Sequence, residues 1–414
     1  MRVAIVGAGI SGLVVAHLLR SHHAVTVFEA AAYAGGHTNT VRVDTAHETH
    51  QIDTGFMVFN DRNYPNFERL LRRLGVAWQA SDMSFSVSEA DGGFEYSSGS
   101  PNGLYATRRN LVTPAFHRMV VELGRFHRAA HRLLARDDSG LTLREWLEQE
   151  RFSRQFVERL IVPQVSAVWS ADPRQLWSFP ARFLAQFLDN HGMLGFRDRP
   201  HWRVIAGGSA RYVDALVSPF ADRIRLGAPV RSVTRGDGGV LVAAAGTEPE
   251  RFDQVVLATH SDQALALLAD ASGREREILA AIPYQSNEAV LHTDARMLPR
   301  RRRAWASWNY HLTDEPKAVP TITYHMNRLQ SLRAEREFCV TLNLTERIDP
   351  DKVIKRIPYA HPVYTAQGVH AQARLGEISG IDRTHYCGAY WGWGFHEDGV
   401  NSALRVAAAL GARS

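Results

Sequence analysis

Three glycines and one glutamate near the start of the chain have the types and spacing needed to hold a dinucleotide. Gly7, Gly9 and Gly12 form a Gly-x-Gly-x-x-Gly motif, and Glu29 follows it. In such a motif the first glycine permits a tight turn, the second lets the backbone approach a pyrophosphate, and the third lets a helix pack on a strand. An acid placed like Glu29 accepts hydrogen bonds from a ribose hydroxyl. These residues predict a ligand that contains adenosine diphosphate.

The elements that must position these residues can be read on both sides of the motif. An apolar run at 2–6 precedes the glycines, a helical pattern runs from Leu13 to Leu19, and a second apolar run at 24–28 ends at Glu29. The order is therefore strand, glycine turn, helix, strand and acid. The pyrophosphate then lies on the free N–H groups of the helix N-terminus, where the helix dipole favours negative charge. This complete context makes an incidental glycine turn the weaker interpretation.

Further glycines recur along the chain at the ends of apolar segments. They stand at 35–36, 55, 207–208 and 388–399. A nicotinamide site usually closes within one compact nucleotide domain, whereas glycines spread in this way suit a long cofactor threaded through the protein. Because no second glycine fingerprint follows, we expect a flavin dinucleotide, with oxygen or a quinone as the electron acceptor.

The remaining pattern divides the chain into parts. Residues 85–96 alternate around a glycine pair and predict a hairpin, and residues 115–190 read as helical. Four β-like segments without long helices between them predict an antiparallel sheet separate from the parallel one. Those segments are Asn287–Thr293, Ala304–Tyr310, Thr321–Met326 and Phe338–Leu344, and a final helix is expected from Val400 to Leu410.

Two stretches of the helical part leave alternatives open. Residues 115–134 are amphipathic and rich in arginine, which is typical of an ordinary surface helix and also of a helix that lies on a membrane. The aromatic run 169–187 suits either core packing or the wall of an apolar pocket.

Length and composition describe an ordinary globular protein. At 414 residues, two intertwined domains are expected. Cys339 and Cys387 lie far apart, so neither a disulfide framework nor a metal site is expected. The net charge of +5 comes almost entirely from arginine, with one dense run at 300–303 and no nucleic-acid motif, and nucleic acid is not an expected partner. No run reaches the roughly 18 apolar residues of a membrane span. We expect a cytoplasmic protein, with peripheral contact at the inner face of the membrane left open.

The motifs together resemble the flavin amine oxidase and phytoene desaturase superfamily. Beyond the first glycines, the resemblance rests on Gly35-Gly36, Asp53-Thr54-Gly55 and Glu397-Asp398-Gly399-Val400. Trp305–Tyr310, His361–Tyr364 and Gly388–Gly399 are similar to a bacterial group known as predicted NAD/FAD-binding proteins, often encoded beside cyclopropane-fatty-acid synthases. The superfamily implies an α/β fold in which a Rossmann-type FAD-binding domain, glutathione-reductase-like and of the amine-oxidase type, is interleaved with an α+β substrate domain. That second domain contains a mixed or antiparallel sheet and a helical subdomain.

The resemblance implies domain boundaries and a set of cofactor contacts. The FAD-binding domain would comprise 1–75, 200–265 and 375–414, and the substrate-binding domain 76–199 and 266–374. FAD would be bound non-covalently, because neither cysteine stands at a recognisable attachment position. The expected FAD contacts are Gly7, Gly9, Ile10, Ser11, Gly12, Glu29, Ala30, Gly35, Gly36, His37, Thr38, Thr54, Gly55, Phe56, Val230, Ala258, Trp393, Asp398, Gly399 and Val400.

Two departures from the superfamily pattern bear on the reaction. Amine oxidases use a lysine near flavin N5, whereas the matching strand here reads Ser286-Asn287-Glu288-Ala289. The aromatic-cage position before the Asp-Gly pair carries His396. Both differences count against amine oxidation. His37 stands where many members have arginine, and it suits either a phosphate or flavin contact or a structural role.

The leading hypothesis is an FAD-dependent oxidoreductase that desaturates a C–C unit of a fatty-acyl or other lipid chain by hydride transfer to flavin N5. His396 and Glu397 are the candidate proton acceptor and its partner, although both suit an ordering role for the cofactor loop. Trp308, Tyr324 and Tyr364 are expected to shape the substrate pocket. The alternatives are a flavin-dependent double-bond isomerase, an amine oxidase, and a non-catalytic flavin-binding partner of a lipid methyltransferase that docks through 115–134.

Overall fold

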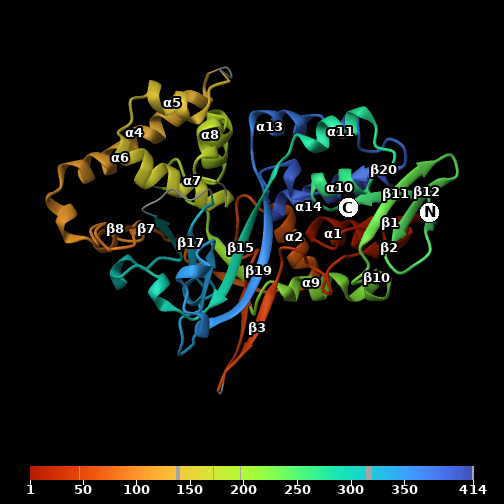
Figure 1. The fold of residues 1–414 in the computed structure, drawn as a ribbon, viewed down its shortest axis with the longest axis horizontal. Helices are drawn as coiled ribbons and strands as arrows, with labels where there is room; N and C mark the ends of the chain where they lie inside the picture. Colours follow the sequence, from red (N-terminus) through yellow and green to blue (C-terminus); the bar gives the residue numbers. More distant parts are fainter. Residues whose placement is uncertain (46, 137–139, 171, 196, 314–318, 413–414) are drawn as a thin grey trace.

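Two lobes lie side by side and are joined by long strands, β15 (Tyr284–His292) and β19 (Val353–Pro362), that run between them (Figure 1). The computed structural model describes residues 1–45, 47–136, 140–170, 172–195, 197–313 and 319–412. One lobe contains both termini and the glycine motif, and the other contains the helical stretch.

The first lobe is built on a five-stranded sheet in which every neighbouring pair is parallel. Alternate residues of its central strand face opposite sides, as the two-residue period of a strand requires. Val3 and Ile5 pack into one hydrophobic cluster, and Ala4 and Val6 pack into another. The strands, in spatial order, are β10 (Ile224–Arg225), β2 (Ala24–Phe28), β1 (Arg2–Val6), β14 (Gln254–Leu257) and β20 (Thr384–Tyr386).

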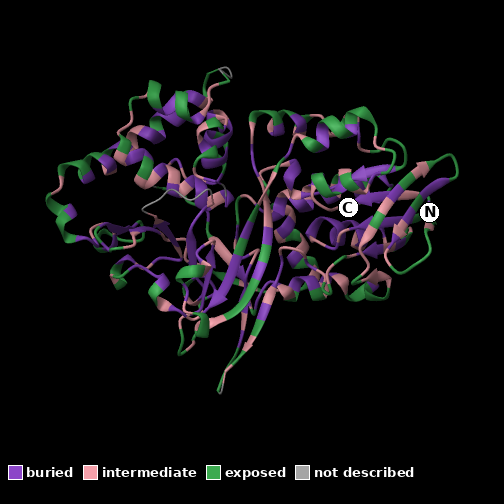
Figure 2. Cartoon of the chain, in the orientation of Figure 1, coloured by how far each residue is buried: buried purple, intermediate pink, exposed green. Residues whose placement is uncertain are grey.

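Different elements cover the two faces of this sheet. The face with Val3 and Ile5 packs on α1 (Ile10–Leu19), α2 (Pro65–Leu74), α9 (Ala210–Val217) and α14 (His396–Ala409). The face with Ala4 and Val6 packs on β11 (Val230–Gly236), β12 (Gly239–Ala244), β13 (Glu250–Phe252), α10 (Ser261–Leu267), α11 (Gly273–Ala280) and α13 (Ala366–Ala373). The sheet is therefore buried on both sides, which Figure 2 shows as a purple interior.

The second lobe contains a seven-stranded mixed sheet. All four predicted segments enter it, although the second begins at Trp308, since Ala304 lies in a 3₁₀ turn. The four predicted segments pair antiparallel with one another, as expected. The sheet is mixed because the early hairpin inserts beside them, and its strand β7 pairs with β16 in parallel. The spatial order is β19, β15, β18 (Cys339–Leu342), β17 (Ile322–His325), β16 (Trp308–Leu312), β7 (Phe85–Glu89) and β8 (Glu95–Ser97).

A helical subdomain lies over this sheet and confirms the helical reading of 115–190, of which 137–139 and 171 lie outside the described residues (Figure 1). Its long helix buries Phe116, Met119, Phe126 and Leu133 against the other helices. The elements are α4 (Pro114–Leu134), α5 (Leu143–Gln149), α6 (Arg154–Phe156), a π-helical turn at Val157–Ile161, α7 (Val162–Trp169) and α8 (Ala181–Asn190).

Two small sheets lie at the junction of the lobes, and the final helix is longer than predicted. It begins at His396, because residues 396–399 already form its first turn. Across the described ranges, no helix is both long and apolar enough to span a bilayer. The small sheets consist of β3 (Thr40–Asp44) with β4 (Thr49–Asp53), and of β5 (Phe59–Asn60), β9 (Trp202–Ile205) and β6 (Trp78–Ala80).

Candidate cofactor and substrate site

A cavity of about 670 Å³ extends from the glycine turn after β1 to the seven-stranded sheet. At one end it is bordered by Gly7, Gly9 and Glu29, and at the other by Trp308 and Tyr324. Residues from both lobes therefore line a single cavity, as a long cofactor with a substrate beside it requires.

The glycine turn is built as its motif predicts. Gly7 has a φ of +104°, and a Cβ there would lie 2.7 Å from the Ala258 carbonyl oxygen, while a Cβ on Gly12 would lie 2.0 Å from the Gly7 oxygen. A Cβ on Gly9 would meet nothing within 4 Å. Gly7 and Gly12 are thus required by packing, whereas Gly9 borders open space of the cavity. Gly9 is also the N-cap of α1 and makes no side-chain cap hydrogen bond, which leaves first-turn N–H groups for a ligand.

Glu29 is held at the cavity wall by two backbone amides. The Ala8 N–H donates to Oε2 at 2.7 Å, and the Ala31 N–H donates to Oε1 at 2.8 Å. A carboxylate oxygen can accept more than one hydrogen bond, so both oxygens keep capacity for ribose hydroxyls. The open space at Gly9, the helix N-terminus and Glu29 together fit the adenosine diphosphate part of a dinucleotide.

Most of the predicted cofactor contacts come together at the cavity, and their individual roles stay predictions. Those that line it are Gly7, Gly9, Ile10, Ser11, Glu29, Ala30, Gly35, Gly36, His37, Thr54, Gly55, Phe56, Val230, Ala258 and Trp393. Gly12, Thr38, Asp398, Gly399 and Val400 lie behind the lining. Gly399 shows why: a Cβ there would lie 2.9 Å from both Ile10 Cγ2 and Ser11 Oγ, so α14 packs closely on α1.

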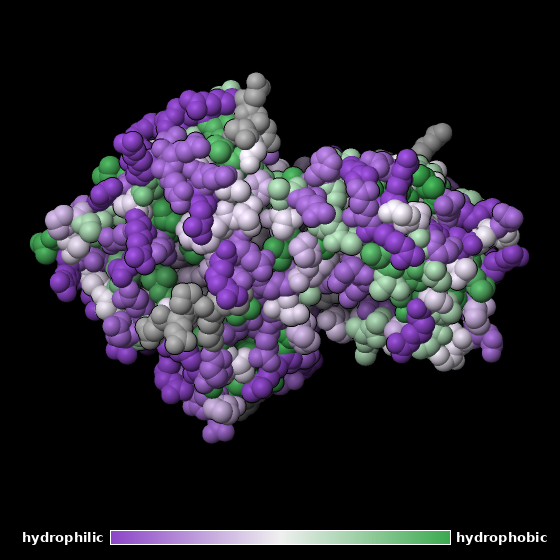
Figure 3. Space-filling model, turned by 45° about the horizontal axis from the view of Figure 1, so that its top comes forward, coloured by the Kyte–Doolittle hydropathy of each residue, from purple (hydrophilic) through white to green (hydrophobic). Residues whose placement is uncertain are grey.

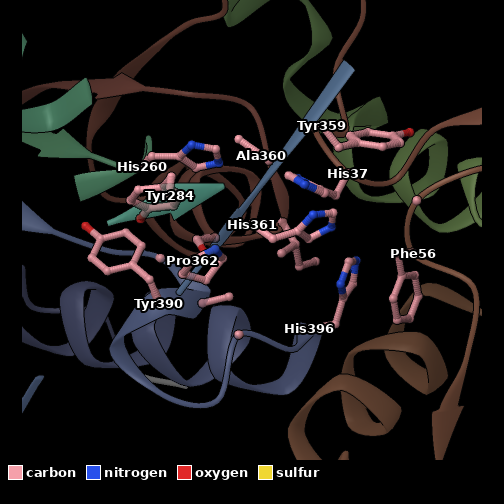
Figure 4. A pocket seen from close by; sticks show the side chains of 18 of the residues that line it. His37, Phe56, His260, Tyr284, Tyr359, Ala360, His361, Pro362, Tyr390 and His396 are labelled. Carbon is pink, nitrogen blue, oxygen red and sulfur yellow. The ribbon is translucent and has the colours of Figure 1, made fainter. Parts of the chain in front are cut away.

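His396 lines the cavity and is anchored on its far side. Its Nε2 lies 2.9 Å from the Tyr212 hydroxyl and 3.0 Å from Thr38 Oγ1, and its ring stacks on Phe56 with centroids 3.4 Å apart (Figure 4). Burial lowers the pKa of His396 well below 6.5, with the nearby His37 adding to the effect. The ring is therefore uncharged at neutral pH, and only Nδ1 is left for a ligand.

Glu397 does not lie beside the His396 ring nitrogens, and its predicted role as a partner in proton transfer is corrected. Its carboxylate accepts hydrogen bonds from the backbone N–H groups of Asn66 at 3.1 Å and Phe67 at 2.8 Å, and from the Asn66 side chain at 3.0 Å. These N–H groups belong to the first turn of α2, which lacks a side-chain cap from Tyr64. Glu397 thus caps a distant helix and joins α14 to α2.

Glu397→Ala is expected to reduce stability while leaving the flavin chemistry of the folded protein intact. Loss of the carboxylate leaves two amides of the α2 first turn without their acceptor, which costs about 2 kcal/mol or more. Urea unfolding measures this loss, and Glu397→Gln, which keeps one acceptor oxygen, is expected to fall between the variant and the wild type. A Glu397→Ala protein of wild-type stability that cannot reduce its flavin would restore the catalytic role.

Three further histidines face the middle of the cavity (Figure 4). His37 was predicted as a cofactor contact, whereas His260 and His361 were not predicted as site residues. The His37 ring centroid lies 5.3 Å from that of His361 and 6.1 Å from that of His260. Burial lowers the pKa of His37 to about 4 and that of His361 to about 3, and it lowers the pKa of His260 as well. His37 stacks on Tyr359 at 4.9 Å, and His260 stacks on Tyr284 at 4.4 Å. These imidazoles are neutral and held in place by aromatic rings.

The end of the cavity beyond the histidines is an aromatic chamber. Trp308, Tyr324 and Tyr364 line it, as predicted, together with Trp169 and Leu342. Among the described aromatic residues of the run 169–187, only Trp169 reaches the wall, because the phenylalanines pack behind it; the Phe187 ring lies 4.5 Å from that of Trp169. Among the described residues that line the whole cavity, Glu29 is the only carboxylate, and no lysine or arginine is present.

Comparisons with known proteins show a family to which the chain belongs and solved structures that share its fold. A family model described as flavin containing amine oxidoreductase matches residues 10–303. No curated protein sequence matches the chain. Cyclohexylamine oxidase from Brevibacterium oxydans has a similar structure, with a TM-score of 0.70, 17% identity and coverage of 99% of this chain and 98% of that one. Wild-type putrescine oxidase bound to putrescine gives 0.70, 16% identity and full coverage of both chains. A CLA-producing fatty acid isomerase from P. acnes gives 0.69, 16% identity and 98% coverage of both chains.

Proposed function

The chain belongs to the family of flavin-containing amine oxidoreductases, and from this membership we propose that it is an FAD-dependent enzyme that desaturates a fatty-acyl or other lipid chain. FAD is its cofactor, and redox chemistry on that cofactor is its reaction class. The lipid substrate and the removal of hydrogen from a C–C unit are the proposed part.

The absence of charge in the aromatic chamber is the observation that carries this proposal. A protonated amine is held most strongly by a charge-assisted hydrogen bond to a carboxylate, and the only carboxylate in the described lining is that of Glu29, at the adenosine end. The sequence of β15 also lacks the lysine expected of an amine oxidase. Apolar and aromatic walls are typical of pockets that bind acyl chains.

The chain's own residues orient the substrate and exclude water. When bound, FAD supplies the acceptor for a hydride from a C–H bond. Trp308 and Tyr324, whose rings meet edge to face at 5.0 Å, form a rigid wall that restricts an acyl chain to one orientation. The proton released with the hydride needs an acceptor, and His396, neutral and open only at Nδ1, is the proposed one. Its low pKa makes it a weak base, which suits a proton that becomes acidic only as the hydride leaves.

Product analysis tests the proposal. The FAD-loaded protein is incubated in air, with or without a quinone, together with phospholipids that carry monounsaturated chains, and the released chains are analysed by mass. Products two mass units lighter support desaturation. Unchanged mass with a moved double bond would indicate an isomerase, a second candidate favoured by the shared fold with a CLA-producing fatty acid isomerase. Turnover of amines alone would refute both.

A basic, partly apolar surface suggests how a lipid substrate is reached, and we propose that it docks on an anionic bilayer. The side chains of Leu111, Val112 and Val121 are 50%, 81% and 72% exposed. Arg109 and Arg128 are exposed nearby along the chain, and Glu122, the only acid in residues 108–132, is buried. Figure 3 shows one face of the molecule, on which hydrophilic residues predominate and apolar residues are scattered among them. Exposed apolar side chains among arginines complement an anionic lipid surface.

Val112→Asp is expected to weaken binding to phosphatidylglycerol-containing vesicles by about tenfold or more, because it removes an apolar anchor and adds a repelled charge. Co-sedimentation measures the binding. The matched control is Leu241→Asp, which changes a 45% exposed leucine on β12 in the other lobe and should bind like the wild type. Equal binding by all three proteins would refute the docking surface.

A further inference from the structure

His361 reaches the cavity with one ring nitrogen already committed. It lies on β19 and lines the cavity beside His37 (Figure 4). The Nδ2 atom of Asn287, on the neighbouring strand β15, lies 2.9 Å from Nδ1 of His361. No described residue makes a hydrogen bond with Nε2. The protonation of the nitrogen that faces the cavity therefore depends on which way the Asn287 amide points.

Backbone groups fix the orientation of Asn287 through two separate side chains. Asn343 accepts the Glu288 N–H at its Oδ1 at 3.0 Å, so its Nδ2 must be the donor to Asn287 Oδ1 at 2.8 Å. Gln285 accepts the Asp172 N–H at its Oε1 at 2.8 Å, so its Nε2 donates to the same Asn287 oxygen at 3.2 Å.

The rest of the Asn287 amide agrees with this orientation. Its Nδ2 also donates to the Ser170 carbonyl oxygen at 3.2 Å. Asn343 and Ser170 both have positive φ angles, 59° and 50°, which are strained for residues other than glycine and tend to persist where the surroundings require them. Because Asn287 Nδ2 is a donor, His361 Nδ1 must accept, and the ring proton must be on Nε2.

We propose that Asn343, Gln285 and Asn287 hold His361 as the neutral Nε2–H tautomer, so that it presents a fixed hydrogen-bond donor to the flavin ring. Burial, with His37 and His260 close by, also lowers the pKa of His361 to about 3, so the ring stays uncharged. His361 is then a cofactor-contacting residue, and the three amides are positioning residues.

The choice of the flavin as acceptor follows from what else the cavity holds. The proposed substrate is an apolar chain with no acceptor at its reacting carbons, and the ribose and phosphates belong at the glycine turn. The flavin ring carries carbonyl oxygens and ring nitrogens, and a donor to these atoms favours the electron-rich reduced form. This choice rests on the proposed function; the tautomer itself does not.

The first test uses the flavin midpoint potential of the purified holoprotein, with no lipid present. His361→Leu removes the donor and is expected to shift the reduction equilibrium towards the oxidised flavin by about tenfold, which corresponds to about 30 mV for a two-electron couple. His361→Gln, whose amide N–H can replace Nε2–H, should restore most of the shift. A midpoint potential of His361→Leu equal to that of the wild type would refute the flavin contact.

The second test examines the tautomer through ¹⁵N-histidine NMR, with the His361 signal identified by its loss in His361→Gln. The wild type should show the proton on Nε2. Asn287→Asp replaces the donor by an acceptor and should move the proton to Nδ1. The matched control is Asn309→Asp, another buried asparagine of the same sheet, outside the cavity lining, which should leave the signal unchanged. A wild-type proton on Nδ1, or an unchanged tautomer in Asn287→Asp, would refute the relay.

The two tests distinguish a failure of the lipid proposal from a failure of the hydrogen-bond relay to His361. If the lipid proposal is wrong, both the potential and the tautomer can still behave as stated. If the relay is wrong, the NMR result shows it whatever the substrate is.

Discussion

Gly9→Val is expected to leave the fold intact and abolish FAD binding. A Cβ on Gly9 meets nothing within 4 Å, and its backbone has an ordinary φ of −75°, so the chain itself tolerates a side chain there. The space that the side chain enters borders the N-terminus of α1, where the pyrophosphate of a dinucleotide belongs. A valine there displaces the phosphates from the helix N–H groups, and we expect affinity for FAD to fall by more than 100-fold.

Flavin absorbance after reconstitution measures this loss, and circular dichroism shows whether the fold persists. Two glycines serve as controls. Gly236→Val also enters open space, but on a hairpin outside the cavity, and should bind FAD normally. Gly12→Val should fail to fold, because a Cβ there would lie 2.0 Å from the Gly7 oxygen. A yellow, FAD-loaded Gly9→Val protein would contradict the assignment of the phosphate site.

Acidification from pH 7 to pH 4.5 is expected to unfold the protein. Burial lowers the pKa of His191 and His292 to about 4 and that of His311 to about 3, and the cavity histidines behave alike. In the unfolded chain these groups have a pKa of about 6.5, so between that pH and the folded pKa values the unfolded chain binds protons that the folded chain does not bind. Their stabilising effect is therefore full above pH 6.5 and is lost as the pH falls towards the folded values.

The size of this effect is large compared with a typical folding free energy. A fully buried histidine such as His292, whose pKa is lowered from 6.5 to about 4, destabilises the folded state by about 3 kcal/mol on full acidification, and typical total stabilities are about 5–15 kcal/mol. Asp53 and Asp398 oppose the trend, because burial raises their pKa to about 6 and the folded state then binds protons more tightly than the unfolded one. The buried histidines outnumber these two acids, so the loss dominates.

Urea midpoints at pH 7.5, 6.0 and 5.0 measure the slope. His191→Asn keeps a donor for the Phe187 carbonyl, which the ring nitrogen Nδ1 contacts at 2.9 Å, but it cannot titrate. It should be less stable at pH 7.5, because the ring packs on Phe187, and should lose less stability between pH 7.5 and 5.0. Stability that is constant from pH 7.5 to 5.0 would contradict neutral buried histidines.

The cofactor end of the site could be predicted because it is local in sequence. One strand–helix–strand unit contains Gly7, Gly9, Gly12 and Glu29. The contacts that explain each of these residues come from neighbours in that unit or from an adjacent strand. The parallel sheet followed from the same strand–helix–strand order and from the continuous apolar runs of its strands. The order of the strands in the mixed sheet did not, since the β7–β16 pairing joins segments more than two hundred residues apart.

The centre of the site could not be read from the sequence for the same reason. His361 depends on Asn287, which depends on Asn343 and Gln285. The motif His361–Tyr364 gave no indication of these hydrogen bonds, because their partners lie far away in the sequence. Glu397 was predicted to assist His396 because the two residues are adjacent in sequence and His396 faces the cavity. In the first turn of α14, however, the Glu397 side chain points to α2. Helical geometry separates adjacent residues by direction, and sequence proximity alone does not show this.

The most direct test of the central claim, an uncharged chamber beside FAD that binds an acyl chain, is anaerobic flavin bleaching. The FAD-loaded protein is mixed without oxygen with phospholipids that carry monounsaturated, cyclopropane or methyl-branched chains, and separately with a panel of amines. We predict that the visible absorbance band of oxidised flavin disappears with one lipid class and persists with every amine. Bleaching by an amine, with none by any lipid, would contradict the claim.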